Sequence, residues 1–571
     1  MQTPRAFYTV QKVKASTKHR FLMNHKFSIL ALALSLLGTA SCNDFLDQYS
    51  QDRVIAKSVQ DLNELLVGDV YLKSEAVNKG VSANTYGFIN ILDDDINTTG
   101  TSQQGNIGNT AWTQTVAPMY GYFTWQQDVR YNYGRTNKNN DDATIKKLYT
   151  RINHVNNIVE LIENMPHSTQ EDDALYHRVK GEALFVRSQF YFTLANLYGR
   201  PYRLDSANVD LCVPLKLTSY VEHQKDKETQ FSRATNAEVY AQMAKDLETA
   251  ASELTTAPQP DRFRLHRASA EAANLLLSRV YLYMQRWNDA EKAARKVVQS
   301  PRAKLTPIAA LQSGKPFLTR NNPEILFTQG SNYLAATDRN TSLTGAPADY
   351  CVTQELYELF SEFDARRNAF FSKNSLSDSL GLTNKYERTN EANHISDGFT
   401  LRTAEAYLNL AEALVMQGKE AEANSVLHQL QRQRIDDKLE DRTGEELVNE
   451  IRNERRRELC FEGHRWFDLR RYSVLEKHPL HKTVVHTFNA YTEQNSFLTT
   501  HLFTLPSGDA AYTFSLPESF VSFDKVPMPN NLRPERVEVK KPRELPELPK
   551  EDEEGNNTDT PNSSDAPSTG A

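Results

Sequence analysis

Apolar residues recur at steps of three and four along much of the chain, a pattern that predicts amphipathic helices. One such stripe of apolar residues predicts a helix from about Asp172 to Tyr198, ended by Gly199 and Pro201. Another predicts a helix that begins near Asn236. The sequence therefore predicts a mainly α protein. The clearest stripe lies in residues 144–163 and consists of Ile145, Leu148, Ile152, Val155, Val159 and Ile162.

Two segments have the pattern of a helix, a short turn and a second helix, at residues 267–299 and 401–434. Their turns are expected around Arg286 and at Gly418, and alanines occupy positions where two helices would approach closely. A length near 34 residues with this pattern is typical of tetratricopeptide-type pairs. Because a single pair cannot bury its apolar face, we expect such pairs to stack into a superhelical scaffold.

The N-terminal region has the pattern of an export signal. Residues 27–40 are apolar and uncharged, too short to span a bilayer but typical of a signal peptide. They lead to Cys42 in a pattern that resembles a bacterial lipoprotein cleavage box, although Thr39 replaces the usual leucine. We therefore predict a signal peptide at 1–41, with Met23 as the natural start and Cys42 as the acylated residue that anchors the protein to the membrane. The alternative is an ordinary secretory peptide.

The remaining chain is expected to form one helical domain over residues 42–530. Two polar segments rich in aromatic residues interrupt it, at 93–140 and 313–350. Loops of this length in a compact domain are usually functional or disordered. Residues 531–571 are rich in Pro and Glu, then in Asn, Thr, Ser and Asp, and contain no aromatic residue. This composition predicts a disordered acidic tail.

Composition narrows the class of function. The net charge of −7 gives no general attraction to nucleic acid. None of the four cysteines is at metal-ligand spacing, and the sequence has no nucleophile elbow or phosphate loop. We therefore expect no metal, no cofactor, no catalytic residues and no nucleic-acid partner.

Several segments, in this order along the chain, resemble the SusD/RagB family of outer-membrane nutrient-binding lipoproteins. The resemblance covers nearly all of the expected mature chain. The chain departs from the family pattern at Ile145, where a tryptophan is common, and in its acidic tail. The matching segments are SCNDFLD at 41–47, 179–202, 266–294, LRTAEAYLNLAEALVMQG at 401–418 and, most specifically, ERRRELCFEGHRWFDLRR at 454–471.

The resemblance implies a scaffold of about four tetratricopeptide-like pairs with irregular loops that bind oligosaccharide at the outer face of the outer membrane. It also implies a TonB-dependent, SusC-like transporter as partner and no enzymatic activity. Relatives that take peptides or glycopeptides make a peptide ligand the first alternative. A glycoside hydrolase is a further alternative, because a chain with 73 acidic residues always offers carboxylate pairs.

Candidate ligand-binding residues follow from the chemistry of sugars, which present flat C–H faces rimmed by hydroxyl groups. Such a ligand calls for exposed aromatic rings beside polar side chains. For each candidate the alternative is core packing, loop solvation or helix capping. From the two polar segments, the candidates are Trp112, Tyr120, Tyr122, Trp125, Tyr333 and Tyr350 as rings, with Asp94 and Asn97 as hydroxyl partners.

A run of three arginines, Arg455 to Arg457, lies within the family-like segment. Glu454, Glu458 and Glu462 lie at helical spacing from the run. We therefore interpret the run as an ion-pair network that ties helices together, rather than as a phosphate or nucleic-acid site.

Overall fold

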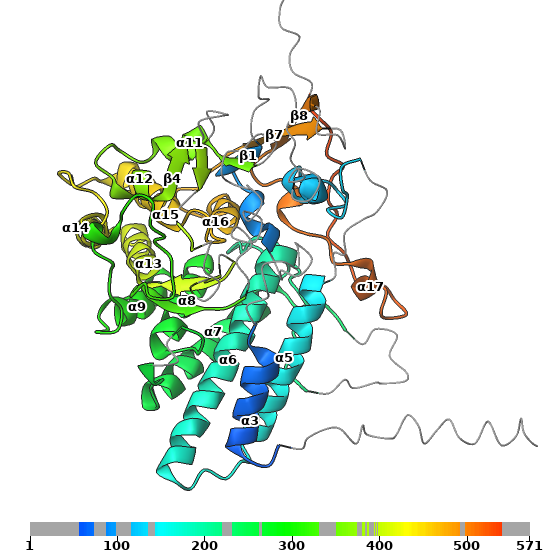
Figure 1. Cartoon of the computed structure of the whole chain (residues 1–571). Coiled ribbons are helices and arrows are strands. Elements are labelled where there is room, and N and C mark those ends of the chain that lie inside the picture. The colour runs from blue at the N-terminus through cyan, green and yellow to red at the C-terminus, as the bar shows by residue number, and fades with distance from the viewer. Residues whose placement is uncertain are drawn as a thin grey trace, which may run out of the picture. The chain divides into compact units, whose positions relative to one another are not determined.

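The computed structural model (Figure 1) divides the chain into two units, residues 1–57 and 58–571. The structure describes residues 56–72, 87–98, 116–134, 143–219, 231–261, 265–330, 350–373, 380–382, 385–387, 393, 395–396, 398–491 and 497–539.

Helices dominate this unit, and the predicted mainly α class is confirmed. No helix in the described ranges is long and apolar enough to cross a membrane. The α-helices are α3 (Val59–Leu65), α4 (Tyr120–Phe123), α5 (Ala143–Ile162), α6 (Gln170–Tyr198), α7 (Asn236–Thr256), α8 (Ala270–Tyr283), α9 (Trp287–Val298), α11 (Gln354–Glu358), α12 (Ala365–Phe370), α13 (Thr403–Met416), α14 (Glu420–Gln431), α15 (Gly444–Leu459), α16 (Arg465–Tyr472) and α17 (Glu518–Val521).

Local sequence explains where the long helices begin and end. The Thr169 side chain caps α6 by accepting a hydrogen bond from the backbone of Asp172. Thr235 and Glu238 form a reciprocal capping box at the start of α7. The last residue of α6 is followed by Gly199, where the sequence predicted the end of the helix.

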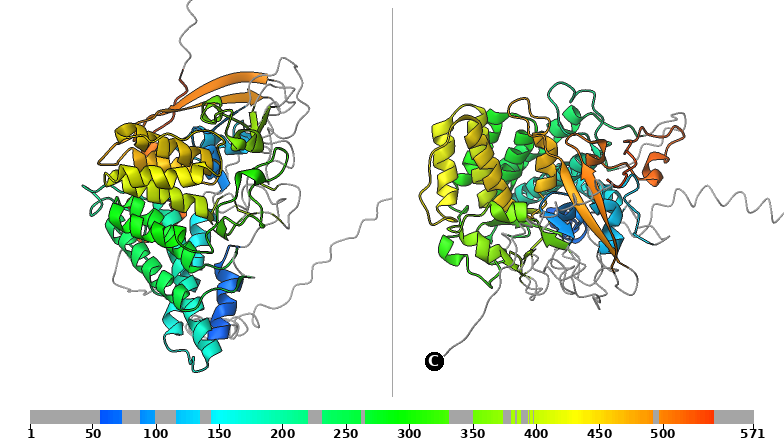
Figure 2. Two further views of the ribbon diagram at one scale, coloured as in Figure 1. Left: turned by 90° about the vertical axis from the view of Figure 1, so that its left-hand side faces the viewer. Right: turned by 90° about the horizontal axis from the view of Figure 1, so that it is seen from above.

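The helices pack side by side in one stack, which the left view of Figure 2 shows from α6 at its lower end to α14 and α15 above. The two predicted helix pairs are α8 with α9 and α13 with α14. The second pair turns at Gly418, whose φ of +76° suits glycine. Leucines and alanines of α13, α14 and α15 form a shared apolar core that includes Ala411, Leu414, Leu427 and Leu447.

Strands form three small antiparallel sheets. A four-stranded sheet has the order β1-β3-β5-β4, and the others pair β2 with β6 and β7 with β8. The strands are β1 (Ile96–Thr98), β2 (Ile325–Thr328), β3 (Tyr350–Val352), β4 (Phe371–Lys373), β5 (Leu380–Leu382), β6 (Thr400–Arg402), β7 (Val484–Tyr491) and β8 (Phe497–Leu505). β7 and β8 lie beside β1, at the opposite end of the unit from α3 in Figure 1.

The C-terminal segment 531–539 packs on the body of the unit. The guanidinium of Arg533 is buried and donates to the backbone carbonyls of Ala511 (2.6 Å) and Gln126 (3.3 Å). The backbone of Val539 donates to Leu502 in β8 (2.8 Å). These hydrogen bonds connect the segment that follows residue 530 to the helical unit as far as Val539.

Buried charges join α15 to the rest of the stack. The Glu458 carboxylate is fully buried and accepts from Arg366 (2.6 Å), Arg402 (2.6 Å) and Arg434 (2.9 Å). Arg457 pairs with Glu454 and Glu450. The interpretation of the arginine run as an ion-pair network is confirmed, and the network brings together residues from four separate segments.

This network makes stability sensitive to acid. Burial raises the pKa of Glu454, but Arg366 and Arg457 outweigh burial and bring it to about 2, below its ordinary value of 4.5. A carboxyl with a lowered folded-state pKa stabilises the fold above the unfolded pKa, and this stabilisation is lost as pH falls. We expect the free energy of unfolding in urea to fall between pH 4.5 and pH 2, with at most about 3 kcal/mol from this group. A Glu454→Gln variant should show a shallower loss, and identical pH curves would contradict the argument.

Candidate functional site

A polar pocket lies where β1 and β3 meet the hairpin of β7 and β8, and we call it the hairpin pocket. Its cavity volume is about 470 Å³. Seven of its nine lining residues carry a hydroxyl or an amide, and none of the nine is charged. The lining residues are Asn97, Thr98, Cys351, Val352, Thr353, Gln354, Thr487, Asn489 and Thr500.

Hydrogen bonds between β1 and β7 hold the walls of the pocket together. The backbone of Thr487 donates to Asn97 Oδ1 (2.8 Å), and the Thr98 hydroxyl donates to the Thr487 carbonyl (2.5 Å). The same hydroxyl accepts from the backbone of Asn489 (3.2 Å). From β8, the Thr500 hydroxyl donates to Asn489 Oδ1 (2.7 Å). The polar groups are thus positioned by strands rather than by isolated loops.

Two of the predicted aromatic residues lie in the core, where they form part of a ring cluster around His486. Trp125 is fully buried, lies 4.3 Å from the His486 ring and donates from Nε1 to the Leu92 carbonyl (2.9 Å). Tyr350 is also buried and contacts Phe123 at 5.4 Å between ring centres. A ring enclosed in this way presents no face to a ligand, so both rings support the protein core.

The other two described tyrosines differ in exposure. Tyr122 is buried and stacks on Phe88 with 4.3 Å between ring centres. Tyr120 is partly exposed and makes an edge contact with Phe488 of β7 at 4.8 Å. Burial raises the pKa of the Tyr120 hydroxyl, which therefore stays protonated at neutral pH and can donate a hydrogen bond.

Asp94 lies in an ion-pair cluster rather than in the hairpin pocket. Its carboxylate accepts two hydrogen bonds from Arg465 (2.7 and 2.8 Å) and lies 3.1 Å from Arg456 and 2.5 Å from Lys482. Burial raises the pKa of Asp94, but Arg465 and Arg456 outweigh this effect and hold the pKa well below its ordinary range. A carboxylate held by three cations serves the fold and is not free to bind a sugar hydroxyl.

Three consecutive carboxyl groups, Asp93 to Asp95, come within 4.8 Å of one another. Burial and the neighbouring acids raise the pKa of Asp93 well above its ordinary value. Because Arg456 and Arg465 already supply positive charge to this cluster, a metal ion would add a further like charge. We therefore infer that the three carboxyl groups stabilise the fold through their ion pairs and do not form a metal site.

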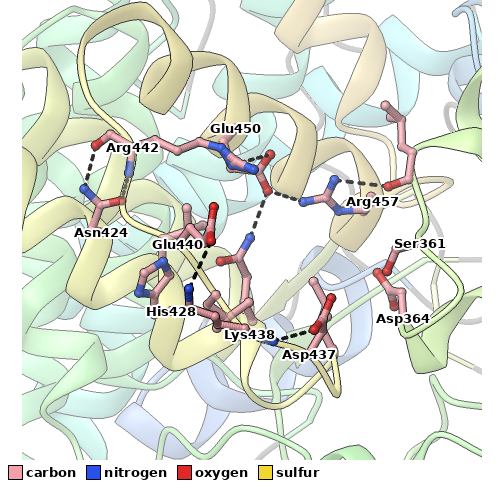
Figure 3. A pocket seen from close by; sticks show the side chains of 15 residues that line it. Ser361, Asp364, Asn424, His428, Asp437, Lys438, Glu440, Arg442, Glu450 and Arg457 are labelled. Carbon is pink, nitrogen blue, oxygen red and sulfur yellow. Dashed lines mark hydrogen bonds and ion pairs between the residues drawn. The ribbon is translucent and has the colours of Figure 1, made fainter.

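A second pocket, shown in Figure 3, lies between α14 and the segment that leads into α15. Its cavity volume is about 450 Å³. The polar side chains that line it pair largely with one another, as Arg457 with Glu450, Lys438 with Glu440, and Asn424 with the backbone of Arg442. The hairpin pocket is therefore the better candidate for recognising an uncharged ligand.

Of the six predicted ligand-binding residues that the structure describes, only Asn97 lines the hairpin pocket. Trp112, Tyr333 and the predicted lipidation site Cys42 lie outside the described residues. The segments that contain Trp112 and Tyr333 adjoin β1 and β3 in the sequence, and both strands line the pocket. The C-terminal residues Thr487, Asn489 and Thr500 were missed, and their alternation along two strands is the signal that could have found them.

Two family models match separate parts of the chain. Residues 376–531 match the model of the SusD family. Residues 71–282 match a second, related model, which is described as "Starch-binding associating with outer membrane". This chain belongs to the SusD/RagB family. No curated protein sequence matches it.

Solved structures of SusD-like proteins share the fold at low sequence identity. A SusD superfamily protein from Bacteroides thetaiotaomicron is 20% identical, with a TM-score of 0.61 over 83% of this chain and 100% of that one. A SusD-like carbohydrate binding protein from Bacteroides vulgatus is 19% identical, with a TM-score of 0.60 over 83% and 99%. Surface glycan-binding protein A from Bacteroides uniformis is 17% identical, with a TM-score of 0.54 over 83% and 99%.

Proposed function

We propose that this SusD/RagB protein is a non-catalytic glycan-binding lipoprotein that binds a neutral oligosaccharide in the hairpin pocket. The observation that carries the proposal is the uncharged lining of hydroxyl and amide groups, in a family with a starch-binding model. Hydroxyl and amide side chains both donate and accept hydrogen bonds, as sugar hydroxyls do. The nine lining residues include no carboxylate, whereas a glycoside hydrolase would use two.

Aromatic residues complete the proposed site. Trp112 and Tyr333 belong to segments that adjoin the pocket strands in the sequence, and we assign them the role of stacking on the sugar rings. Tyr120, partly exposed beside β7, is a further candidate. Stacking would supply apolar contact, and the pocket would supply the hydrogen bonds that give specificity.

The proposal includes an anchor and a partner. The lipoprotein-like sequence at Cys42 and the description of the matching family model support attachment to the outer membrane. We propose that the protein faces the cell exterior and passes its ligand to a TonB-dependent, SusC-like transporter. Labelled palmitate should be incorporated by the wild type and lost in Cys42→Ser. Cross-linking in intact cells should recover a transporter, and recovery of none would contradict this part of the proposal.

Titration calorimetry against neutral oligosaccharides, including malto-oligosaccharides, tests binding. We expect Thr500→Val, which removes one hydroxyl from the pocket, to weaken binding about threefold to tenfold. We expect Trp112→Ala to weaken binding about tenfold through lost stacking. Phe523→Ala is the matched control, because Phe523 is an exposed aromatic residue outside the pocket. This variant should bind the oligosaccharide with the affinity of the wild type.

Three results would contradict the proposal. One is absence of binding to every oligosaccharide by the wild type. Another is binding to short peptides alone, which would favour the peptide alternative. The third is steady release of reducing sugar by purified protein, which would favour a hydrolase.

A further inference from the structure

A groove separate from the hairpin pocket lies between the second half of α7 and the first half of α8, and is bordered by the end of α9. We call it the α7–α8 groove. Its cavity volume is about 670 Å³, within the range of small-ligand sites of about 300–1,000 Å³. It shares no lining residue with the hairpin pocket. The lining residues used below are Leu254, Glu271, Asn274, Leu277, Lys296 and Arg302.

One buried polar atom in this groove lacks a hydrogen-bond partner. Asn274 is only 6% exposed, and its Nδ2 donates to the Ala270 carbonyl (2.8 Å), which fixes the orientation of the amide. Its Oδ1 accepts no hydrogen bond from any residue in the described part of the chain. Leaving a buried acceptor unsatisfied costs about 1–3 kcal/mol. A group that donates a hydrogen bond from within the groove would remove that cost.

The other lining groups indicate a neutral, hydroxyl-rich ligand. Glu271 accepts from the Ser300 hydroxyl (2.8 Å), and Lys296 is an exposed donor at the rim. Two acidic and two basic side chains line the groove, so that it has no excess of charge. Leu254 and Leu277 add apolar surface that a sugar ring could cover. Ten of the fifteen lining residues are polar, which disfavours an apolar ligand.

We infer that the α7–α8 groove is a second saccharide site, sized for a mono- or disaccharide, in which a sugar hydroxyl donates to Asn274 Oδ1. The inference shares the ligand class of the proposed function but rests on different residues. A second site would let the protein hold two parts of a branched glycan or two glycan chains at once, which increases avidity without new contacts at either site.

Ligand-observed NMR and calorimetry on the full chain test the inference, with glucose, galactose, mannose, maltose and cellobiose as probes. We expect Lys296→Glu and Asn274→Leu to weaken binding of one of these sugars by about tenfold. Thr500→Val, which is expected to weaken binding in the hairpin pocket, is the comparison that separates the two sites. Lys292→Glu is the matched control, because Lys292 lies one turn away on α9, is 75% exposed at its side chain and does not line the groove.

The outcomes separate the two sites. Sugar binding that responds to Lys296→Glu but not to Thr500→Val supports the groove even if the hairpin pocket binds nothing. Sugar binding that is weakened only by Thr500→Val contradicts a saccharide site in the α7–α8 groove and leaves the proposed function intact. A crystal soaked with the probes that shows only water at Asn274, or peptide binding that Lys296→Glu abolishes, also overturns the inference.

Discussion

Replacing Glu458 by alanine is expected to lower the free energy of unfolding by about 3–5 kcal/mol. The carboxylate is fully buried and is shared by Arg366, Arg402 and Arg434, which come from separate segments of the chain. These cations hold the pKa of Glu458 well below its ordinary range, against the effect of burial. Removing the shared acid would leave buried guanidinium groups that repel one another. Urea unfolding followed by circular dichroism measures the loss.

Glu440→Ala is the control for this prediction. Glu440 is exposed, lines the pocket in Figure 3 and, among the described residues, pairs with the exposed Lys438 (3.2 Å). Exposed ion pairs contribute roughly 0–1 kcal/mol. A loss in Glu458→Ala no larger than the loss in Glu440→Ala would show that the network does not hold the helices together.

The second large effect is expected for Trp125→Ala, which should cost about 3–5 kcal/mol of unfolding free energy. The indole is fully buried, stacks on His486 and donates to the Leu92 carbonyl. Its removal leaves a cavity in the ring cluster and a carbonyl without that donor. Thermal unfolding by differential scanning calorimetry would record the change as a lowered Tm.

Tyr131→Ala serves as the comparison, because Tyr131 follows six residues later and is 47% exposed. It should change the free energy of unfolding by about 0.5 kcal/mol or less. If Trp125→Ala instead keeps full stability and loses sugar affinity, Trp125 would be a ligand contact and the burial argument would be wrong.

Sequence patterns predicted the helical part of the fold well. The helix predicted from Asp172 begins at Gln170, and the one expected near Asn236 begins at that residue. Helices with a strong apolar period are determined largely by local sequence, because capping residues and periodicity lie within a few turns. The arginine run was interpretable only in part: Arg457 pairs with Glu454 at helical spacing on the same helix, whereas Arg455 and Arg456 pair with Asp468 and Asp95 from other segments.

The candidate site was less predictable, because distant segments build it. Trp125 lies in a polar stretch that suggested an exposed loop, but His486, far along the chain, covers its ring. Thr487 contacts Asn97 only after β1 and β7 come together, and no local sequence pattern predicts that contact. Asn97 was found because it belongs to the polar segment itself, whereas the β7–β8 hairpin follows a helical region and was not predicted.

The hydrogen bonds that join Asn97 and Thr98 to Thr487 set an order on folding. They join strands separated by nearly the whole domain, and contacts at such separation form late because a long loop must close first. The helical stack can pack before β7 and β8 reach β1, whereas the hairpin pocket forms only after they do. A chain shortened before β7 would therefore be expected to fold its helical stack but to lack the hairpin pocket.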